Sequence, residues 1–196
     1  MELAPREGLE QGIIQNEMEG NIAAAYRFSD CDGVHNGKSG WSFGITQIDL
    51  NANPMLARAC LVACGFSLAE RSALQAETIA DMKPMNAKLK AAATIVDKYD
   101  DQQLDYCLTH VQMVAETRGF TYADNFSVVI AADYSNQIGM GVNGGLAAHL
   151  VALGRPATGL DIYNYKMNIT WGQKRPDDVK RRFNNIARIY GRAEVK

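Results

Sequence analysis

The chain of 196 residues contains 47% hydrophobic and 21% charged residues, with a formal net charge of −2 and a pI of about 5.9. This composition excludes disordered and fibrous classes. Without an excess of positive charge there is no reason to expect a nucleic-acid partner. The length allows one well-buried core. We therefore expect a single domain over residues 1–196 and a monomer.

The sequence carries no signal for a membrane or for secretion. No run of about 18 apolar residues occurs, so no membrane insertion is expected. The first residues, MELAPREGLEQG, include acids and lack the apolar segment of a secretory signal. We expect synthesis in a cytoplasm without a signal peptide.

The cysteines do not form the framework of a disulfide-rich protein at this length. Cys60 and Cys64 lie four residues apart in an expected helix, where their Cβ atoms would be about 5–6 Å apart. That distance exceeds the separation of about 3.5–4.5 Å in a disulfide, so we expect buried free thiols. Cys31 and His35 have no paired ligand motif nearby, so neither a metal site nor a cofactor is expected.

Helical periodicity dominates the chain. Leu9, Ile13, Met18 and Ile22 form one apolar stripe, which predicts a first helix from residue 7 to about 25. Capping residues, prolines and glycines predict further helices over residues 53–65, 67–82, 84–99, 100–119, 122–139, 144–154 and 175–191.

The polar stretch after the first helix has a different pattern, in which Trp41, Phe43 and Ile45 alternate with Ser42, Gly44 and Thr46. This alternation predicts a short antiparallel β ribbon. The expected fold class is α+β, mainly α. A small β-containing cleft region covers residues 19–50, with the β element near residues 27–50, and a helical part covers about 53–196. An exception to local regularity is where a functional site is expected.

Carboxyl groups in contrasting environments flank this ribbon. Glu19 is expected at or near the C-terminal end of the first helix, where the helix dipole and apolar neighbours such as Ile22 favour the protonated form. Asp30 and Asp32 lie in a polar loop, which favours the ionised form. Two such carboxyl groups across a groove can cleave a glycosidic bond.

Residue types alone also allow a simpler interpretation. A glutamate near a helix end is commonly a solvated charge, and an aspartate in a loop rich in glycine and asparagine commonly forms a turn. Glu17 competes with Glu19 for the acid role. The two are separated by about 200° around a helix, at about 100° per residue, so both cannot face one cleft.

The segment EGNIAAAY, residues 19–26, resembles the Glu-Gly and tyrosine pattern that opens the catalytic region of phage-type lysozymes, the endolysins. The resemblance implies that Glu19 is the general acid and that Tyr26 lies in the cleft. SFG, residues 42–44, stands where that family has a Thr-Ile-Gly-like tripeptide, which gives Ser42 a role in holding water. Asp30 and Asp32 both lie farther from the glutamate than in the family, so the choice between them stays open.

A second segment, SFGITQID, is similar to a motif of goose-type lysozymes and lytic transglycosylases. This similarity implies that Gln47 contacts the sugar, and it offers Asp49 as another candidate for the second carboxylate. AADYSNQIG is similar to a Tyr-Asn element of the same relatives, with Tyr134 and Asn136 as cleft residues. KRRFNNIARIYG resembles the arginine-rich closing helix of phage lysozymes.

These resemblances imply a lysozyme-like fold and a muramidase that cleaves the β-1,4 bond between N-acetylmuramic acid and N-acetylglucosamine in peptidoglycan glycan strands. Glu19 would protonate the leaving oxygen, while the second carboxylate stabilises the transition state or deprotonates water. The expected catalytic set is Glu19, Asp30 and Ser42, and the expected substrate contacts are Tyr26, Asp32, Gln47, Asp49, Tyr134 and Asn136.

Two alternatives stay open. One is another enzyme of the same superfamily, either a lytic transglycosylase or a chitin- or chitosan-cleaving hydrolase. The other is a non-catalytic helical protein that binds polysaccharide or serves a structural role. The expected route for a muramidase is release from the bacterial cytoplasm to the periplasm and cell wall, either as a phage endolysin or as an exported effector. The basic C-terminal helix would help it approach anionic envelope polymers.

Overall fold

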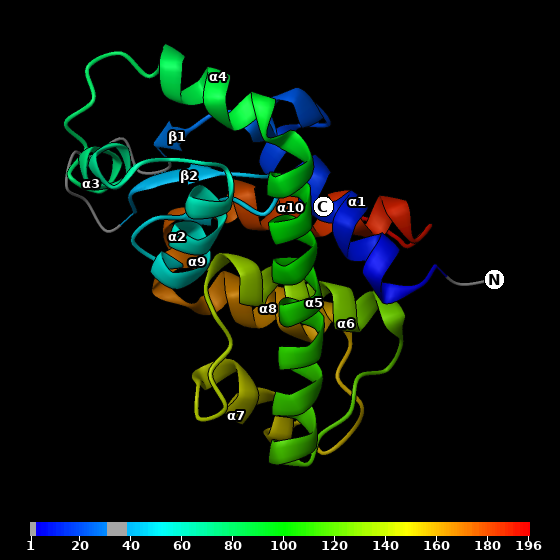
Figure 1. Cartoon of the computed structure of the whole chain (residues 1–196). Helices are drawn as coiled ribbons and strands as arrows, with labels where there is room; N and C mark the ends of the chain where they lie inside the picture. Colours follow the sequence, from blue (N-terminus) through cyan, green and yellow to red (C-terminus); the bar gives the residue numbers. More distant parts are fainter. Residues whose placement is uncertain (1–2, 31–38) are drawn as a thin grey trace. The chain divides into compact units, whose positions relative to one another are not determined.

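The computed structural model describes residues 3–30 and 39–196 (Figure 1). Contacts divide the chain into two compact units. One consists of Glu17–Gln103, and the other combines the residues up to Asn16 with Leu104–Lys196. A compact unit with its own core does not have to fold alone, so the single domain expected from the sequence stays a prediction.

The unit Glu17–Gln103 contains a small sheet surrounded by helices. Its elements are the 3-10 helix η1 (Ile22–Tyr26), the strands β1 (Ser29–Asp30), β2 (Trp41–Phe43) and β3 (Ile48–Asp49), the helices α2 (Pro54–Ala63), α3 (Leu68–Gln75) and α4 (Lys83–Ala91), and the beginning of α5 (Ala93–Arg118). The strands pair antiparallel in the order β1-β2-β3. Ser42 is opposite Ser29 on one side and Asp49 on the other. Helix α4 contacts η1, and α2 contacts β3.

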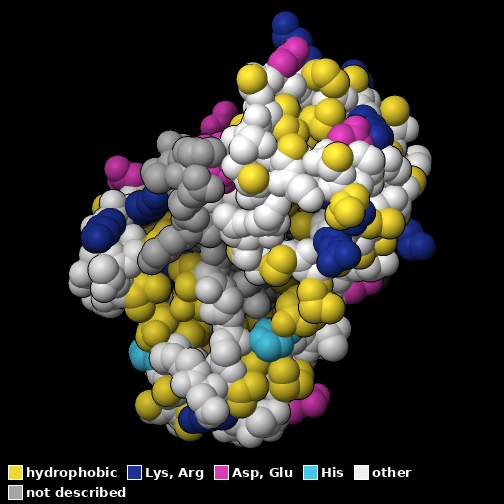
Figure 2. All heavy atoms as spheres, turned by 60° about the vertical axis from the view of Figure 1, so that its left-hand side comes forward, with side chains coloured by type: hydrophobic (Ala, Val, Ile, Leu, Met, Phe, Trp, Pro, Cys, Tyr) yellow, Lys and Arg dark blue, Asp and Glu magenta, His cyan; other side chains and the backbone are white. Residues whose placement is uncertain are grey.

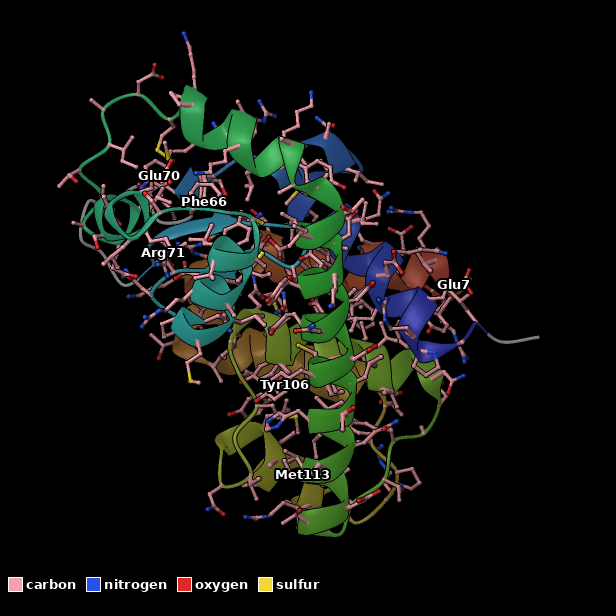
Figure 3. All side chains as sticks on the ribbon, in the orientation of Figure 1. Glu7, Phe66, Glu70, Arg71, Tyr106 and Met113 are labelled. Carbon is pink, nitrogen blue, oxygen red and sulfur yellow. The ribbon has the colours of Figure 1, made fainter. Side chains whose placement is uncertain are left out.

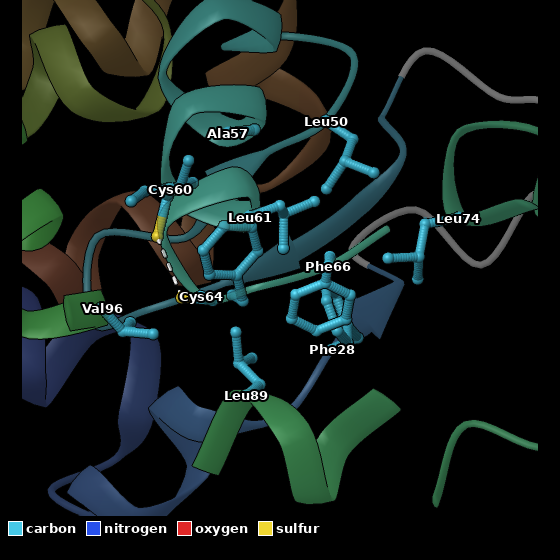
Figure 4. Close-up of a cluster of buried hydrophobic side chains, with 12 residues drawn as sticks. Phe28, Leu50, Ala57, Cys60, Leu61, Cys64, Phe66, Leu74, Leu89 and Val96 are labelled. Carbon is cyan, nitrogen blue, oxygen red and sulfur yellow. Dashed lines mark hydrogen bonds between the residues drawn. The ribbon is translucent and has the colours of Figure 1, made fainter. Parts of the chain in front are cut away.

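One hydrophobic cluster joins these elements (Figure 4). At its centre the Phe28 ring packs edge-on against the rings of Phe43 and Phe66, with centroids 5.4 and 6.0 Å apart. Cys60 and Cys64 are buried free thiols with sulfur atoms 3.9 Å apart, as expected from the sequence. Burying a large apolar side chain contributes roughly 1.5–3 kcal/mol, so this cluster holds the sheet against α2, α3 and α4.

The second unit is helical. Its elements are α1 (Pro5–Met18), the rest of α5, α6 (Asn125–Gln137), α7 (Gly145–Ala152), α8 (Gly159–Asn168), α9 (Thr170–Lys174) and α10 (Pro176–Ile189). Helices α6, α8 and α10 contact one another. Gly12 lets α1 approach α10 closely, because a Cβ atom there would lie 2.8 Å from Cγ1 of Ile186.

A buried ion cluster lies within this helical core. Asp133 on α6 accepts hydrogen bonds from Nη2 of Arg182 at 2.5 Å and from Nδ2 of Asn16 at 3.0 Å. The Lys166 ammonium lies 3.8 Å from the same carboxylate. Burial opposes ionisation of Asp133, but its two cationic neighbours hold its pKa below the usual value. Buried charges persist in proteins when they are paired in this way.

The predicted fold class is confirmed at the coarse level, since the structure is mainly helical with one small antiparallel sheet. Several boundaries differ. The first helix ends at Met18 and not at about residue 25, because Glu19 and Gly20 both adopt positive φ. The helix expected over residues 67–82 ends at Gln75, two residues before Glu77, whose φ is also positive. The chain from Ala93 to Arg118 is one helix, where a boundary near residue 99 was expected.

The sequence does not predict the helices α8 and α9. Within residues 3–30 and 39–196, no helix combines the length and the hydrophobicity that a membrane span requires. On the face that Figure 2 shows, Lys and Arg side chains are scattered among neutral and hydrophobic ones.

Candidate functional site

Glu19 follows the last residue of α1, the position that the sequence predicts. Its φ is +49°, a left-handed conformation that few residues with a Cβ atom adopt, and φ of Gly20 is +80°. The Glu19 side chain is exposed, and no hydrogen bond or ion pair of its carboxylate occurs within the described residues. The expectation that Ile22 helps to bury the Glu19 carboxyl group is wrong, because the Ile22 side chain is itself 48% exposed.

The 3-10 helix η1 connects Glu19 to the β sheet. The N–H of Asn21 donates to the carbonyl of Met18, so the chain turns directly out of α1 into η1. At the other end of η1, the carbonyl of Ala25 accepts a 2.8 Å hydrogen bond from the N–H of Gly44. Glu19 is thus joined through one short helix to the four-residue turn between β2 and β3, residues 44–47, called the 44–47 turn below.

A carboxylate on α5 holds the 44–47 turn. Asp100 accepts hydrogen bonds from the N–H groups of Ile45 and Thr46, at 2.9 and 3.0 Å, and from the Thr46 hydroxyl at 2.6 Å. Asp100 is only 2% exposed. Burial raises the pKa of Asp100 to about 6, although these hydrogen bonds favour its ionised form. Asp100 therefore positions the turn and carries a proton equilibrium near neutral pH.

The fit between Asp100 and the turn requires glycine at position 44. Gly44 has φ of +78°, and a Cβ atom there would lie 2.5 Å from Oδ1 of Asp100. Such a distance is shorter than real Cβ contacts. The glycine of the SFG tripeptide thus serves both the left-handed backbone and the close approach of the carboxylate.

Asp49 and Ser42 form a second buried polar pair in the sheet. The Ser42 hydroxyl, only 1% exposed, donates to Oδ2 of Asp49 at 3.0 Å. The Asp49 carboxylate also accepts from the backbone N–H groups of Gly40, Asn51 and Ala52. Its oxygens are therefore engaged in shaping the loop between β3 and α2. The predicted roles of Ser42 with water and of Asp49 with substrate stay predictions.

Gln47 closes the 44–47 turn at the edge of the sheet. Its φ is +53°, and its side chain stabilises that conformation, because Nε2 donates to the carbonyl of Gly44 at 3.1 Å. Oε1 of Gln47 accepts from the Ser29 hydroxyl at 2.9 Å. The side chain is half-buried, so it presents an amide at the surface of a rigid turn.

Tyr26 closes η1 and is held from α5. Its hydroxyl donates to Oδ1 of Asp97 at 2.8 Å. Burial and this hydrogen bond together raise the pKa of Tyr26 to about 12. The ring packs against the hydrophobic cluster of this unit. Tyr26 is therefore a neutral, oriented phenol, able to stack against a sugar ring or to hydrogen-bond its hydroxyl groups.

The remaining predicted residues are placed as follows. Asp30 ends β1 opposite Trp41 and is exposed. Asp32, together with Cys31 and His35, lies outside the described residues. Tyr134 and Asn136 lie on α6 in the other unit. Tyr134 is 5% exposed, and its ring lies beneath the Lys166 ammonium at 5.9 Å.

The structure thus joins Tyr26, Ser42, Gln47 and Asp49 around one small sheet. Sequence reasoning missed Asp97 and Asp100, which come from a helix more than fifty residues away. A signal for Asp100 exists: Val96, Asp100 and Leu104 follow one another at spacing four, and the two apolar members are buried. A carboxylate on the buried stripe of a helix requires a partner.

Comparison with known proteins adds no assignment. No protein-family model, no curated protein and no solved structure matches this chain. Within the described residues, no group of three or more His, Cys, Asp and Glu side chains is arranged to hold a metal ion.

Proposed function

We propose that this protein is a peptidoglycan hydrolase of lysozyme-like fold that cleaves the β-1,4 bond between N-acetylmuramic acid and N-acetylglucosamine. Glu19 transfers its proton to the glycosidic oxygen as the bond from that oxygen to C1 breaks. Water then attacks C1 and gives its proton to a carboxylate, for which Asp30 is the first candidate among the described residues. Asp32 and Asp49 are the other candidates.

The backbone conformation of Glu19 is the observation that supports this proposal most directly. A non-glycine residue at positive φ costs of order 1–3 kcal/mol, and such residues cluster at active sites and ligand clamps. Three non-glycine residues have positive φ in the described chain, and Glu19 and Gln47 are two of them. The third, Glu77, lies two residues beyond the end of α3. The conformation thus occurs at the residues to which the sequence resemblances give the acid and a sugar contact.

A lytic transglycosylase is the second candidate function. The hydrogen bonds that Asp49 already accepts favour it. This enzyme requires the acid but no second carboxylate to activate water. The muramic acid 6-hydroxyl attacks C1 instead and gives its proton to the Glu19 carboxylate, which has already protonated the leaving oxygen. The Asp49 oxygens are already engaged by one hydroxyl and three backbone N–H groups. If Asp30 and Asp32 are also dispensable, no second carboxylate among these residues remains to activate water.

The test is the release of soluble fragments from purified peptidoglycan by wild type and by Glu19→Gln, with mass analysis of the product ends. Glutamine keeps the size of the side chain but has no carboxyl proton to donate, so we expect a loss of activity of about 10²-fold or more. New reducing ends indicate a hydrolase, and anhydro ends indicate a transglycosylase. Glu17→Gln, two residues earlier on α1, is the matched control and keeps its activity.

Two outcomes oppose the proposal. Equal cleavage by wild type and Glu19→Gln removes Glu19 from the mechanism and moves the acid role to Glu17. No cleavage by wild type, combined with retained binding to peptidoglycan, favours the non-catalytic polysaccharide-binding protein. Chitin and chitosan serve as parallel substrates and separate the remaining hydrolase alternatives. For a muramidase, action in the periplasm and cell wall after release from the cytoplasm is part of the same proposal.

A further inference from the structure

A pocket lies between α2 and α3, in the same unit as Glu19. It has a volume of about 520 Å³, within the range of small-molecule pockets. We call it the α2–α3 pocket, and it is lined by Leu50, Pro54, Ala57, Arg58, Leu61, Leu68, Arg71, Ser72, Gln75 and Ala76. None of these residues belongs to the candidate site around Glu19.

The floor of the α2–α3 pocket is apolar and fixed. Leu50, Ala57 and Leu61 are at most 3% exposed, as parts of the hydrophobic cluster (Figure 4). Leu68, at the first position of α3, is 69% exposed and forms an apolar edge. Because the buried members are held by the core, the pocket is formed in the absence of any ligand.

The polar side of the pocket consists of two arginines. Arg58 makes no hydrogen bond or ion pair within the described residues, and Arg71 donates only Nε to the carbonyl of Ser67, at 3.3 Å. No acidic side chain is among the residues that line the pocket. Two guanidinium groups without a carboxylate, beside an apolar floor, fit a ligand that has both carboxylates and small apolar groups.

The nearest acid in sequence does not neutralise these arginines. Glu70 precedes Arg71 on α3, but its carboxylate lies 2.8 Å from Nζ of Lys88 on α4 and also accepts from the N–H of Ser67. Lys88 and the capping hydrogen bond hold the pKa of Glu70 at about 2. In Figure 3, Glu70 lies on the side of α3 toward α4, and Arg71 lies on the side toward α2. The positive charge of the pocket is therefore available to a ligand.

We propose that the α2–α3 pocket binds the acidic peptide stem of peptidoglycan. This inference rests on the proposed function, because a muramidase meets glycan strands that carry such stems. The stem presents free carboxylates for Arg58 and Arg71. It also presents alanine methyl groups for the apolar floor and for the edge formed by Leu68. Because of this contact, the protein should bind peptidoglycan more tightly than it binds a polysaccharide without peptides, such as chitin.

The first test is direct binding of a synthetic stem peptide, L-Ala-D-Glu-L-Lys-D-Ala-D-Ala, to the full chain by NMR titration or calorimetry. We expect saturable binding, with shifts of the amides of α2 and α3. Replacing both arginines (Arg58→Ala with Arg71→Ala) should weaken binding about tenfold or more, since charge-assisted contacts are lost. The matched control, Lys90→Ala with Lys98→Ala, removes the same charge from exposed positions outside the pocket and leaves binding unchanged.

Two further arms make the test specific. A stem peptide with amidated carboxyl groups should bind about tenfold more weakly to wild type, because the carboxylates are the groups that the arginines recognise. Leu68→Asp puts a negative charge at the pocket edge, in the first turn of α3 where an acid favours the helix. It should therefore weaken binding without loss of fold, which circular dichroism checks.

The outcomes separate this inference from the proposed function. On peptidoglycan that carries its peptides, the double arginine variant should have a higher KM than wild type and the same kcat. On glycan strands from which an amidase has removed the peptides, the variant and wild type should have the same KM and kcat. No saturable binding of the stem peptide up to about 10 mM, or equal binding by wild type and the double arginine variant, overturns the inference even if Glu19-dependent cleavage is found. Peptide binding in the pocket without any cleavage leaves the pocket in place and contradicts only the hydrolase.

Discussion

At the scale of single residues, Gly44 determines whether the 44–47 turn can form against Asp100. Gly65, which ends α2, is a matched control in the same unit. Its φ of +80° is nearly that of Gly44 at +78°, yet a Cβ atom there would meet nothing within 4 Å. The two positions therefore separate the cost of the backbone conformation from the cost of steric overlap.

We expect Gly65→Ala to lower the free energy of unfolding by about 1–2 kcal/mol, the cost of a left-handed alanine. Gly44→Ala should cost more, by about 1–3 kcal/mol, because its Cβ would lie 2.5 Å from Oδ1 of Asp100. Urea denaturation measures both. Equal losses for the two variants would mean that Asp100 moves away without penalty, and its three hydrogen bonds would then be of little importance for the turn.

The left-handed conformation of Glu19 gives a second prediction at this scale. Glycine adopts φ of +49° without the steric cost that a Cβ atom causes there. Glu19→Gly should therefore raise the free energy of unfolding by about 0.5–1 kcal/mol, after allowing for the entropy of the more flexible unfolded chain. It should also abolish the proposed cleavage of peptidoglycan.

The control for this combined gain of stability and loss of cleavage is Glu77→Gly, at φ of +51°. It relieves the same conformation just beyond the end of α3 and should keep full activity. Stability is read from urea denaturation and activity from the release of peptidoglycan fragments. A loss of stability in Glu19→Gly would indicate that the Glu19 side chain contributes to the fold.

At the scale of elements, local signals in the sequence were sufficient for some helices. Ser67 and Glu70 form the expected capping box, and Pro54 begins α2 as predicted. Such signals involve neighbours in the chain, so one sequence reveals them. Glu19 does lie at the end of the first helix as expected, although that end was predicted at about residue 25 and not at Met18.

Helix α8 was not predicted, although Thr158 and Asp161 form a capping box of the same kind. Its sequence includes Gly159 and residues of modest helix propensity. Tertiary packing determines its place: Gly159 lies against Phe126, where a Cβ atom would be 2.5 Å from Cε1 of the ring. The hydrogen bonds that Asp100 accepts from residues 45 and 46 could not be predicted from the sequence either. They join segments far apart in the chain and leave no local pattern.

Helix α10 shows how burial separates neighbouring charges that the sequence groups together. Arg181 forms a partly exposed ion pair with Asp178 at 2.6 Å, and Arg188 pairs with Glu194. Arg182 is 2% exposed and holds Asp133. The basic surface that could approach anionic polymers is thus smaller than the sequence suggests, and Arg182 is not part of it.

We expect Arg182→Ala to lower the free energy of unfolding by about 3–5 kcal/mol, because it leaves the buried Asp133 without its main partner. Arg181→Ala, one residue earlier, should cost less, about 1–2 kcal/mol, because it removes a partly exposed ion pair and one hydrogen bond to the carbonyl of Asn16. Thermal and urea denaturation compare the two. Similar small losses would mean that Lys166 alone is sufficient to compensate Asp133.

At the scale of the whole molecule, the two units contain buried carboxylates with opposite pKa shifts. In the unit Glu17–Gln103, burial raises the pKa of Asp100 from 3.8 to about 6. In the other unit, Asp133 and Asp178 are also buried or partly buried, but neighbouring arginines lower their pKa values below the usual one. Acidification therefore changes the stability of the two units in opposite directions and over different pH ranges.

The sign for Asp100 follows from its raised pKa. Its contribution to stability is fully present below the unfolded pKa near 3.8 and is lost as pH rises through about 6. Between pH 7 and pH 5 the unit Glu17–Gln103 should gain about 1 kcal/mol, since one pKa unit corresponds to about 1.4 kcal/mol. The ion pairs of Asp133 and Asp178 instead contribute above pH 3.8 and are lost as pH falls through their folded pKa values.

Hydrogen exchange, corrected for the intrinsic rate at each pH, resolves the two units in one experiment. From pH 7 to pH 5 the buried amides of α2 should become about tenfold more protected, while those of α6 and α10 should not change. Toward pH 3, α6 and α10 should lose protection first. In Asp100→Asn the increase in protection of the α2 amides should vanish, because asparagine does not titrate. An increase that persists in the variant would assign it to another group, and a parallel response of both units would show that they unfold together.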